Sequence, residues 1–126
     1  MKYKTNEDTS KGTKHDQGKP MLSLVPLDFI AGVGEAFTYG ATQKYDPHNF
    51  KKGIQTQRLL DAALRHIYLE ISGIPIDTES NLEHWKLAGA SIAMYAYMKR
   101  HHPELDDRYI PTVEEQEKLI ASIYGK

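Results

Sequence analysis

The feature that most constrains this chain is a break at residues 73–80, between two long stretches with helical spacing of apolar residues. Before the break, the period is about 3.6, which predicts an amphipathic helix over Gln55–Ser72. Gly73 and Pro75 end it, because glycine commonly caps helices and proline cannot continue one. A second helix is expected from Asn81 to about His101. The sequence therefore predicts two antiparallel helices joined by a tight connection.

The second of these helices has apolar residues around most of its circumference, so we expect it inside the domain or against a second subunit. Ser80 or Thr78 is its expected N-terminal cap. The run Thr112–Glu115 forms a capping box and predicts a final helix through Ile123.

An earlier helix is predicted from Pro26 to about Lys44, since proline suits the first helical position. Gly32, Gly34 and Gly40 weaken it, each by about 1 kcal/mol relative to alanine. We expect these glycines to allow close approach of another backbone. With no run of alternating β-branched residues, the chain is predicted to be all-α, a bundle of about four helices with an extended N-terminal arm.

Length and composition set the class of protein. The 126 residues suffice for one domain, and we expect a flexible arm over residues 1–14 and a single helical domain over residues 15–126. The chain has no cysteine, which excludes thiol catalysis and disulfides. Its 16 basic and 17 acidic residues provide no broad positive field for a nucleic-acid polymer. Without a signal peptide or an apolar stretch long enough to span a membrane, a cytoplasmic location is expected.

Polar groups gather around the 73–80 connection, where a helical core would normally be apolar. They are Arg65, His66 and Glu70 on one side and Asp77, Glu79, Glu83 and His84 on the other. This combination of imidazole, guanidinium and carboxylate groups is typical of a site for a phosphorylated ligand.

The carboxylates suggest a metal-assisted reaction. Mg²⁺ or Mn²⁺ prefers oxygen ligands with open positions for water and phosphate, so the predicted metal ligands are Glu70, Asp77, Glu79 and Glu83. In hydrolysis of a phosphoanhydride, Glu70 or Glu83 would act as the base and His84 as proton donor or phosphate contact.

Phosphates also need positive donors. Arg65 offers a bidentate fork, and Lys19 and Lys44 offer point charges. A base could stack on one of four aromatic residues: Tyr39, Tyr45, Phe50 or Trp85. Each residue also has a structural explanation.

Asp77 could bond the backbone of its own turn, and Glu79 and Glu83 suit a helix N-terminus. His66 could be a core histidine satisfied by Asp61 or Asp77.

Several segments in order resemble a phage-associated family of dATP/dGTP diphosphohydrolase-like proteins, itself similar to MazG-like all-α nucleoside triphosphate pyrophosphatases. The matching segments are Asp16–Pro20, Leu24–Pro26, Tyr39–Ala41, Lys44–Tyr45, Asn49–Phe50, Lys52–Gly53, Ala62–His66, Gly73, Asp77–Ser80 and His84. The resemblance implies a homo-oligomer that binds a purine nucleotide and splits a triphosphate into monophosphate and pyrophosphate with a metal. Carried over by position, the nucleotide-binding residues include Lys19, Lys44, Tyr45, Asn49, Arg65 and His66.

Three positions depart from the family pattern: Leu87 and Ser91 stand where polar ligands are usual, and Phe50 replaces tryptophan. The alternative is therefore a non-catalytic binding protein, a sponge that sequesters a nucleotide or cyclic-nucleotide signal of host antiphage defence. A third hypothesis is a structural oligomer with the helix over residues 81–100 as its interface. If a phage encodes the chain, the compartment is the host cytoplasm.

Overall fold

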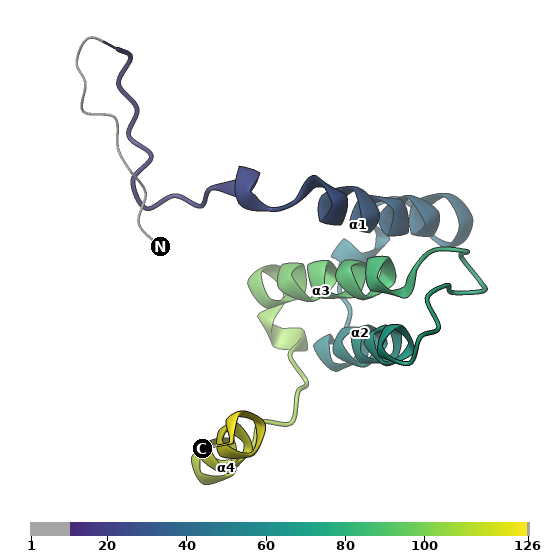
Figure 1. Ribbon diagram of the computed structural model, residues 1–126, viewed down its shortest axis with the longest axis vertical. Coiled ribbons are helices and arrows are strands. Elements are labelled where there is room, and N and C mark those ends of the chain that lie inside the picture. Colours follow the sequence, from purple (N-terminus) through teal and green to yellow (C-terminus); the bar gives the residue numbers. More distant parts are fainter. Residues whose placement is uncertain (1–10, 126) are drawn as a thin grey trace.

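The computed structural model describes residues 11–125 and confirms the all-α prediction (Figure 1). Within this part of the chain there are four α-helices and no strand, only an isolated bridge between Ile76 and Glu83. The α-helices are α1 (Leu27–Tyr39), α2 (Thr56–Ile71), α3 (His84–His101) and α4 (Val113–Tyr124). Short turns of helix are η1 (Leu22–Leu24), η2 (Gly40–Lys44), η3 (Asn49–Lys52) and η4 (Pro103–Leu105).

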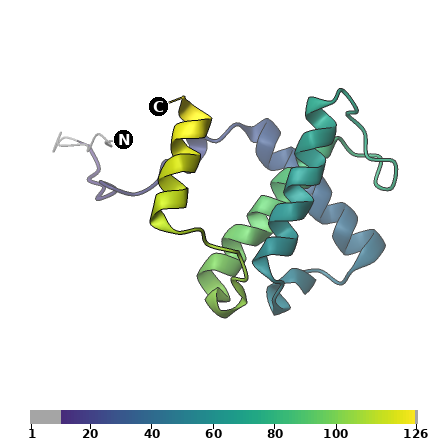
Figure 2. The same ribbon diagram turned by 90° about the horizontal axis from the view of Figure 1, so that it is seen from below.

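Helix α3 lies between α1 and α2, and these three helices pack together as one unit (Figures 1 and 2). The buried apolar side chains are mostly small, which allows the helices to approach closely. They are Ala36, Leu59, Ala63, Ala88, Ala90 and Met98. Among residues 11–125, no helix combines the length and apolar character needed to cross a lipid bilayer.

Of the three glycines expected to allow close packing, Gly32 does so, although α3 approaches it with side chains and not with its backbone. A Cβ atom added to Gly32 would lie 2.7 Å from Cζ3 of Trp85, far inside normal contact distance. On the facing side, a Cβ atom on Gly89 would lie 2.7 Å from Val33 Cγ2. The prediction was wrong for Gly34 and Gly40, since neither has a neighbour within 4 Å of such a Cβ atom. Among the three glycines of this helix, only Gly32, which faces α3, is needed for packing.

Helix α2 matches its predicted range, and its first turn is capped from a distant part of the chain. The Gln57 backbone N–H donates to Asp107 Oδ1 at 2.9 Å, and the buried Thr56 hydroxyl donates to Asp106 Oδ1 at 3.1 Å. These bonds tie the segment after η4 to the start of α2. At the other end Gly73, with φ of +79°, leads out of the helix as predicted.

Helix α3 begins at His84, three residues later than the sequence predicted. Neither Ser80 nor Thr78 is its cap, because Glu83 occupies that position. The Ser80 hydroxyl is instead bonded within the preceding turn, and Asn81 has a left-handed φ of +61°. The turn therefore continues where the helix was expected to start.

The remaining segments agree in part with prediction. The helix from Pro26 to Lys44 is observed, with η2 a wider π-type turn after α1. The capping box of the final helix is present in both directions between Thr112 and Glu115. The proposed arm over residues 1–14 falls mostly on residues 1–10, outside the described residues. From residue 11 to the start of α1, the segment is exposed, with a turn at residues 16–19 and the short helix η1 as its regular features.

Candidate functional site

One end of the three-helix unit gathers most of the polar residues singled out in the sequence. The C-terminal end of α2 and the N-terminus of α3 meet there, next to the 72–83 connection (Figure 1). Lys44 and Glu79 link η2 to this connection through an ion pair of 2.7 Å. The Tyr39 hydroxyl, at 3.4 Å from the Glu79 carbonyl, donates a second, longer link.

A pair of histidines lies at the centre of this end. Nδ1 of His66 on α2 lies 2.8 Å from Nδ1 of His84 at the start of α3. His84 is buried, with 4% of its surface exposed, and its backbone N–H donates to the Pro75 carbonyl at 2.8 Å. A hydrogen bond between two ring nitrogens needs one proton, so one ring donates and the other accepts. We call His66 and His84 the histidine pair.

Burial and the neighbouring charges favour the neutral form of His66. Partial burial lowers the pKa of His66 below its ordinary value, and His84 and Arg65 lower it further, against the opposing effect of Asp77. With both rings neutral, the ring that donates through Nδ1 has a bare Nε2, while the ring that accepts carries a proton on Nε2. The pair can therefore offer one proton acceptor and one proton donor.

Two predicted catalytic carboxylates are engaged by one tryptophan. Glu70 Oε1 accepts from the backbone N–H of Trp85 at 3.0 Å, and so caps the first turn of α3 from the neighbouring helix. Glu83 Oε2 accepts from the indole Nε1–H of the same Trp85 at 2.6 Å. Both carboxylates therefore lie beside the histidine pair in sequence and in space, but each already accepts a hydrogen bond from the protein.

Asp77 bonds to its own turn, which is the structural alternative that the sequence offered. Its Oδ2 accepts from the Ser80 backbone N–H at 2.9 Å and from the Ser80 hydroxyl at 2.7 Å. Burial by itself would raise the pKa of Asp77, but the Ser80 bonds and the nearby histidines outweigh it and lower the pKa. Asp77 is therefore an anion that closes its own turn. Its spacing of three residues from Ser80 is the sequence signal for this arrangement.

The predicted metal ligands are consequently not assembled into one donor set. Among residues 11–125, no group of three or more histidine, aspartate or glutamate side chains is arranged to hold a metal ion. Glu79 forms an ion pair with Lys44. Glu70 and Glu83 accept hydrogen bonds from Trp85, and Asp77 accepts from Ser80. In this arrangement the four carboxylates do not form a shared site for Mg²⁺ or Mn²⁺. Binding of a metal ion by these residues stays a prediction.

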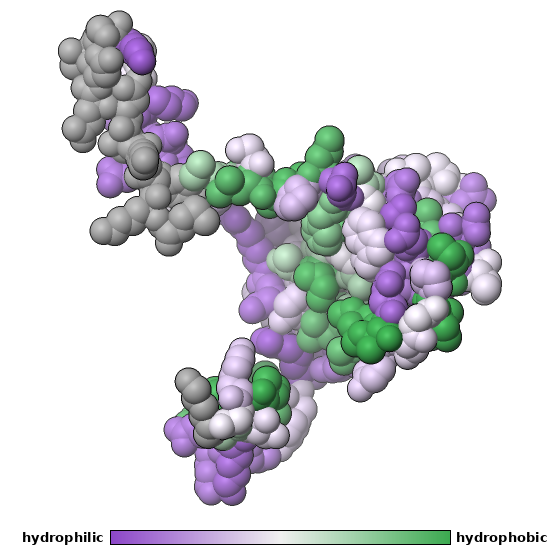
Figure 3. All heavy atoms as spheres, in the orientation of Figure 1, coloured by the Kyte–Doolittle hydropathy of each residue, from purple (hydrophilic) through white to green (hydrophobic). Residues whose placement is uncertain are grey.

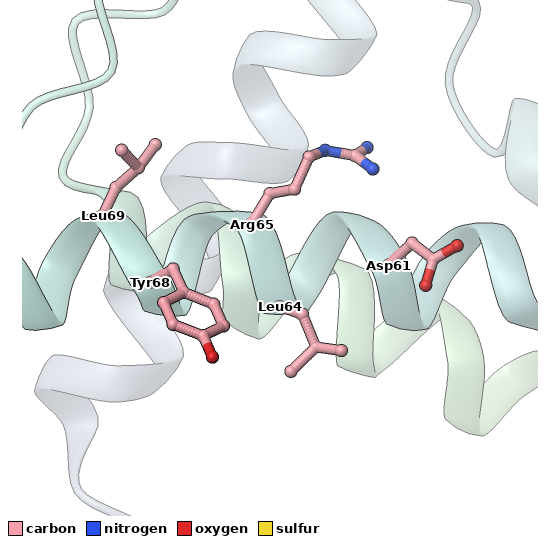
Figure 4. Close-up of a pocket in the computed structure, with 5 residues that line it drawn as sticks. All are labelled: Asp61, Leu64, Arg65, Tyr68 and Leu69. Carbon is pink, nitrogen blue, oxygen red and sulfur yellow. The ribbon is translucent and has the colours of Figure 1, made fainter.

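Arg65 is adjacent to His66 in sequence but lies on another face of α2. It is exposed and lines a shallow, open pocket on the outside of the helix (Figure 4). The other lining residues are Asp61, Leu64, Tyr68 and Leu69. The guanidinium is therefore available to a ligand, although it is not part of the histidine pair.

The predicted nucleotide-binding residues are divided between the two ends of the unit. Tyr45 is exposed beside Lys44, whose Nζ lies 5.9 Å from the centre of the tyrosine ring. Phe50 and its neighbour Asn49 belong to η3, and the Phe50 ring packs at 5.4 Å from Tyr97. Tyr97 is 13 residues after His84 on α3, about 20 Å along the helix.

Phe50 therefore packs far from the histidine pair, and its ring also contacts Phe37 at 5.5 Å. Lys19 is exposed in the segment before α1, in a turn closed by its own N–H and the Asp16 carbonyl. The structure brings Lys44, Tyr45, Glu70, Asp77, Glu79, Glu83, His66 and His84 to one end of the unit, and leaves Lys19, Asn49 and Phe50 elsewhere.

The sequence suggested Trp85 as a residue on which a base could stack, but not the contacts that it makes in the structure. Its ring stacks on Phe29 at 6.3 Å and fills the space left by Gly32, while its two N–H groups bind Glu70 and Glu83. Trp85 thus positions both carboxylates. Stacking of a base on Trp85 stays a prediction.

Comparison with known proteins gives the family. Residues 9–108 match the family described as dATP/dGTP diphosphohydrolase, N-terminal. A protein of Salmonella phage PMBT28, called dATP/dGTP diphosphohydrolase, is 34% identical over 116 residues. The match covers 89% of this chain but 39% of that protein, so the chain spans about two fifths of its relative's length. No solved structure matches the chain. With most of its length matched, the chain belongs to the dATP/dGTP diphosphohydrolase N-terminal domain family.

Proposed function

We propose that this protein binds a purine deoxynucleoside triphosphate at the end of the unit that carries the histidine pair, and hydrolyses it to monophosphate and pyrophosphate. Membership of the dATP/dGTP diphosphohydrolase family supports the substrate class and the reaction. The single structural observation that carries the proposal is the hydrogen bond of 2.8 Å between His66 and His84. With both rings neutral, this bond gives the site one proton acceptor and one proton donor.

The reaction needs a proton to be removed from water and a charge to be compensated. The bare Nε2 of one ring accepts a proton from the water whose oxygen attacks the α-phosphorus. The bond from that phosphorus to the bridging oxygen breaks, and pyrophosphate leaves. The Nε2–H of the second ring can donate to a phosphate oxygen.

Lys44, whose side chain is 38% exposed, supplies positive charge for the phosphates. Its contact with Glu79 raises the pKa of Lys44, which keeps the amine protonated. Arg65, exposed on the neighbouring face of α2, can reach a ligand that extends beyond the pair. These cations would bind the triphosphate, and the histidine pair would act on it.

A second function is favoured by the state of the carboxylates. Glu70, Asp77, Glu79 and Glu83 each bond to a protein group, so none is held ready for a metal ion. Leu87 and Ser91 provide no further carboxylate on α3. A non-catalytic sponge that holds a nucleotide or cyclic nucleotide would use the same cations and histidines without hydrolysis.

The test compares turnover with binding. Purified protein is incubated with dATP or dGTP, with and without Mg²⁺ or Mn²⁺, and the products are separated by chromatography. The proposal predicts pyrophosphate and monophosphate in equal amounts, and loss of at least about 100-fold in rate for His66→Gln, typical of removing an acid–base group. His101→Gln, an exposed histidine at the far end of α3, is the matched control.

Calorimetry with the same nucleotides and with cyclic dinucleotides separates the two functions. Binding without product identifies the sponge. Neither binding nor product from any of these compounds overturns both functions.

A further inference from the structure

Helix α4 has well-formed ends, but in the described part of the chain no other element packs extensively on its sides. Thr112 and Glu115 form a complete capping box at its start, and Gly125 with φ of +70° ends it. Within the described part of the chain, no other element packs extensively against it, and it stands apart in both ribbon views (Figures 1 and 2). A 12-residue helix without tertiary contacts is marginal in water. Its folding therefore calls for a partner surface.

The side chains of α4 indicate the chemistry of the surface that would bind it. Its apolar residues are largely exposed, and they are Val113, Leu119, Ile120, Ile123 and Tyr124. Its charged residues are three glutamates against one lysine, Glu114, Glu115, Glu117 and Lys118. The complementary surface is thus apolar with positive charge at its border. An acidic helix of this kind is repelled by an anionic lipid surface.

A surface of that description lies at the other end of the same chain. We call residues 21–30 the N-terminal apolar segment; its exposed apolar residues are Met21, Leu22, Leu24, Val25, Leu27, Phe29 and Ile30. The preceding residues 11–20 carry three lysines against one aspartate. Both the apolar character and the charge therefore match α4.

Geometry keeps the two surfaces apart within one chain. The segment and α4 project from the same side of the three-helix unit, with an open recess between them (Figures 1 and 3).

We propose that two copies of this chain form a dimer in which α4 of each copy packs on the N-terminal apolar segment of the other. Such a reciprocal contact uses the same two surfaces twice and closes with twofold symmetry. The interface differs from the one expected on the helix over residues 81–100. Helix α4 also lies beyond residues 9–108, which match the family.

The first experiment measures the mass of the full chain in solution by light scattering. The proposal predicts twice 14.3 kDa, and a rise of at least about 10-fold in the dissociation constant for Ile123→Glu or for Leu27→Glu, as expected for a charge in an apolar contact. Ile92→Glu, a half-exposed position on α3, is the matched control and should leave the dimer intact. A monomeric wild type, or a dimer lost only with Ile92→Glu, overturns the proposal.

The second experiment uses the absence of cysteine from the chain. Leu24→Cys protein and Ile120→Cys protein are made separately, mixed and oxidised. A disulfide-linked pair containing one of each supports the exchange of α4, because neither chain can form it alone. If Ile92→Cys cross-links to Ile120→Cys as efficiently, or if no mixed pair forms, the proposed contact is wrong.

Discussion

The contact between Gly32 and Trp85 allows a sharp test of how α1 packs on α3. Gly32→Ala adds one methyl group, whose carbon would lie 2.7 Å from Cζ3 of Trp85 and 3.1 Å from Cγ of Lys86. The indole is not free to retreat, because it stacks on Phe29 and donates to Glu83 at 2.6 Å. The methyl group must therefore separate the helices or displace the indole.

Two opposing terms set the size of the effect. Alanine in place of glycine inside a helix stabilises by about 1 kcal/mol. Overpacking of a well-filled contact costs about 1–3 kcal/mol, and the restrained indole places Gly32→Ala in the upper part of this range. We expect a net loss of about 1–2 kcal/mol in the free energy of unfolding. Gly34→Ala, two residues along and with no neighbour within 4 Å, should gain about 1 kcal/mol.

Urea denaturation followed by circular dichroism measures both variants. The fluorescence of Trp85, the single tryptophan, reports whether the indole has moved. The difference between the two variants, about 2–3 kcal/mol, isolates the steric term because the change in helix propensity is common to both. Equal stability of Gly32→Ala and Gly34→Ala would refute the close contact between α1 and α3.

Three further predictions concern the site and the caps. Because burial lowers the pKa of His66, the unfolded chain binds more protons than the folded one below its ordinary pKa of about 6.5. The free energy of unfolding should therefore fall from pH 7 to pH 5, and His66→Gln should flatten this decline in urea titrations. Asp107→Ala removes the acceptor for Gln57 N–H and should cost about 1 kcal/mol by thermal denaturation, while a neutral result would exclude the cap. Glu70→Ala should cost about as much and speed hydrogen exchange at the Trp85 amide, whereas Glu70→Gln should preserve most of the protection.

The helices could be predicted from the sequence because their signals are local. Glycine and proline after Ser72 and the Thr112 capping box each act within a few residues, and both were confirmed. The start of α3 could not be predicted in the same way. Ser80 can cap a helix or close a turn with Asp77, and spacing does not distinguish these two uses.

The candidate site was harder to predict because it depends on side-chain direction across two helices. The sequence placed His66 and His84 on either side of one connection, but their direct contact depends on how α2 packs on α3. Asp61 and Asp77 were the expected partners of His66, and neither is its hydrogen-bond partner. The contacts of Trp85 with two carboxylates could not be predicted, because its two N–H groups bind residues 15 positions before it and two positions before it, a pattern with no local signature.

The bond between Glu70 and the Trp85 amide has a consequence for how occupancy of the site can be detected. Any guest that draws the carboxylate towards itself must remove it from the first turn of α3, leaving that amide exposed to solvent. Binding of a ligand and fraying of the first turn of α3 would then occur together. A single backbone resonance, that of Trp85, would report both.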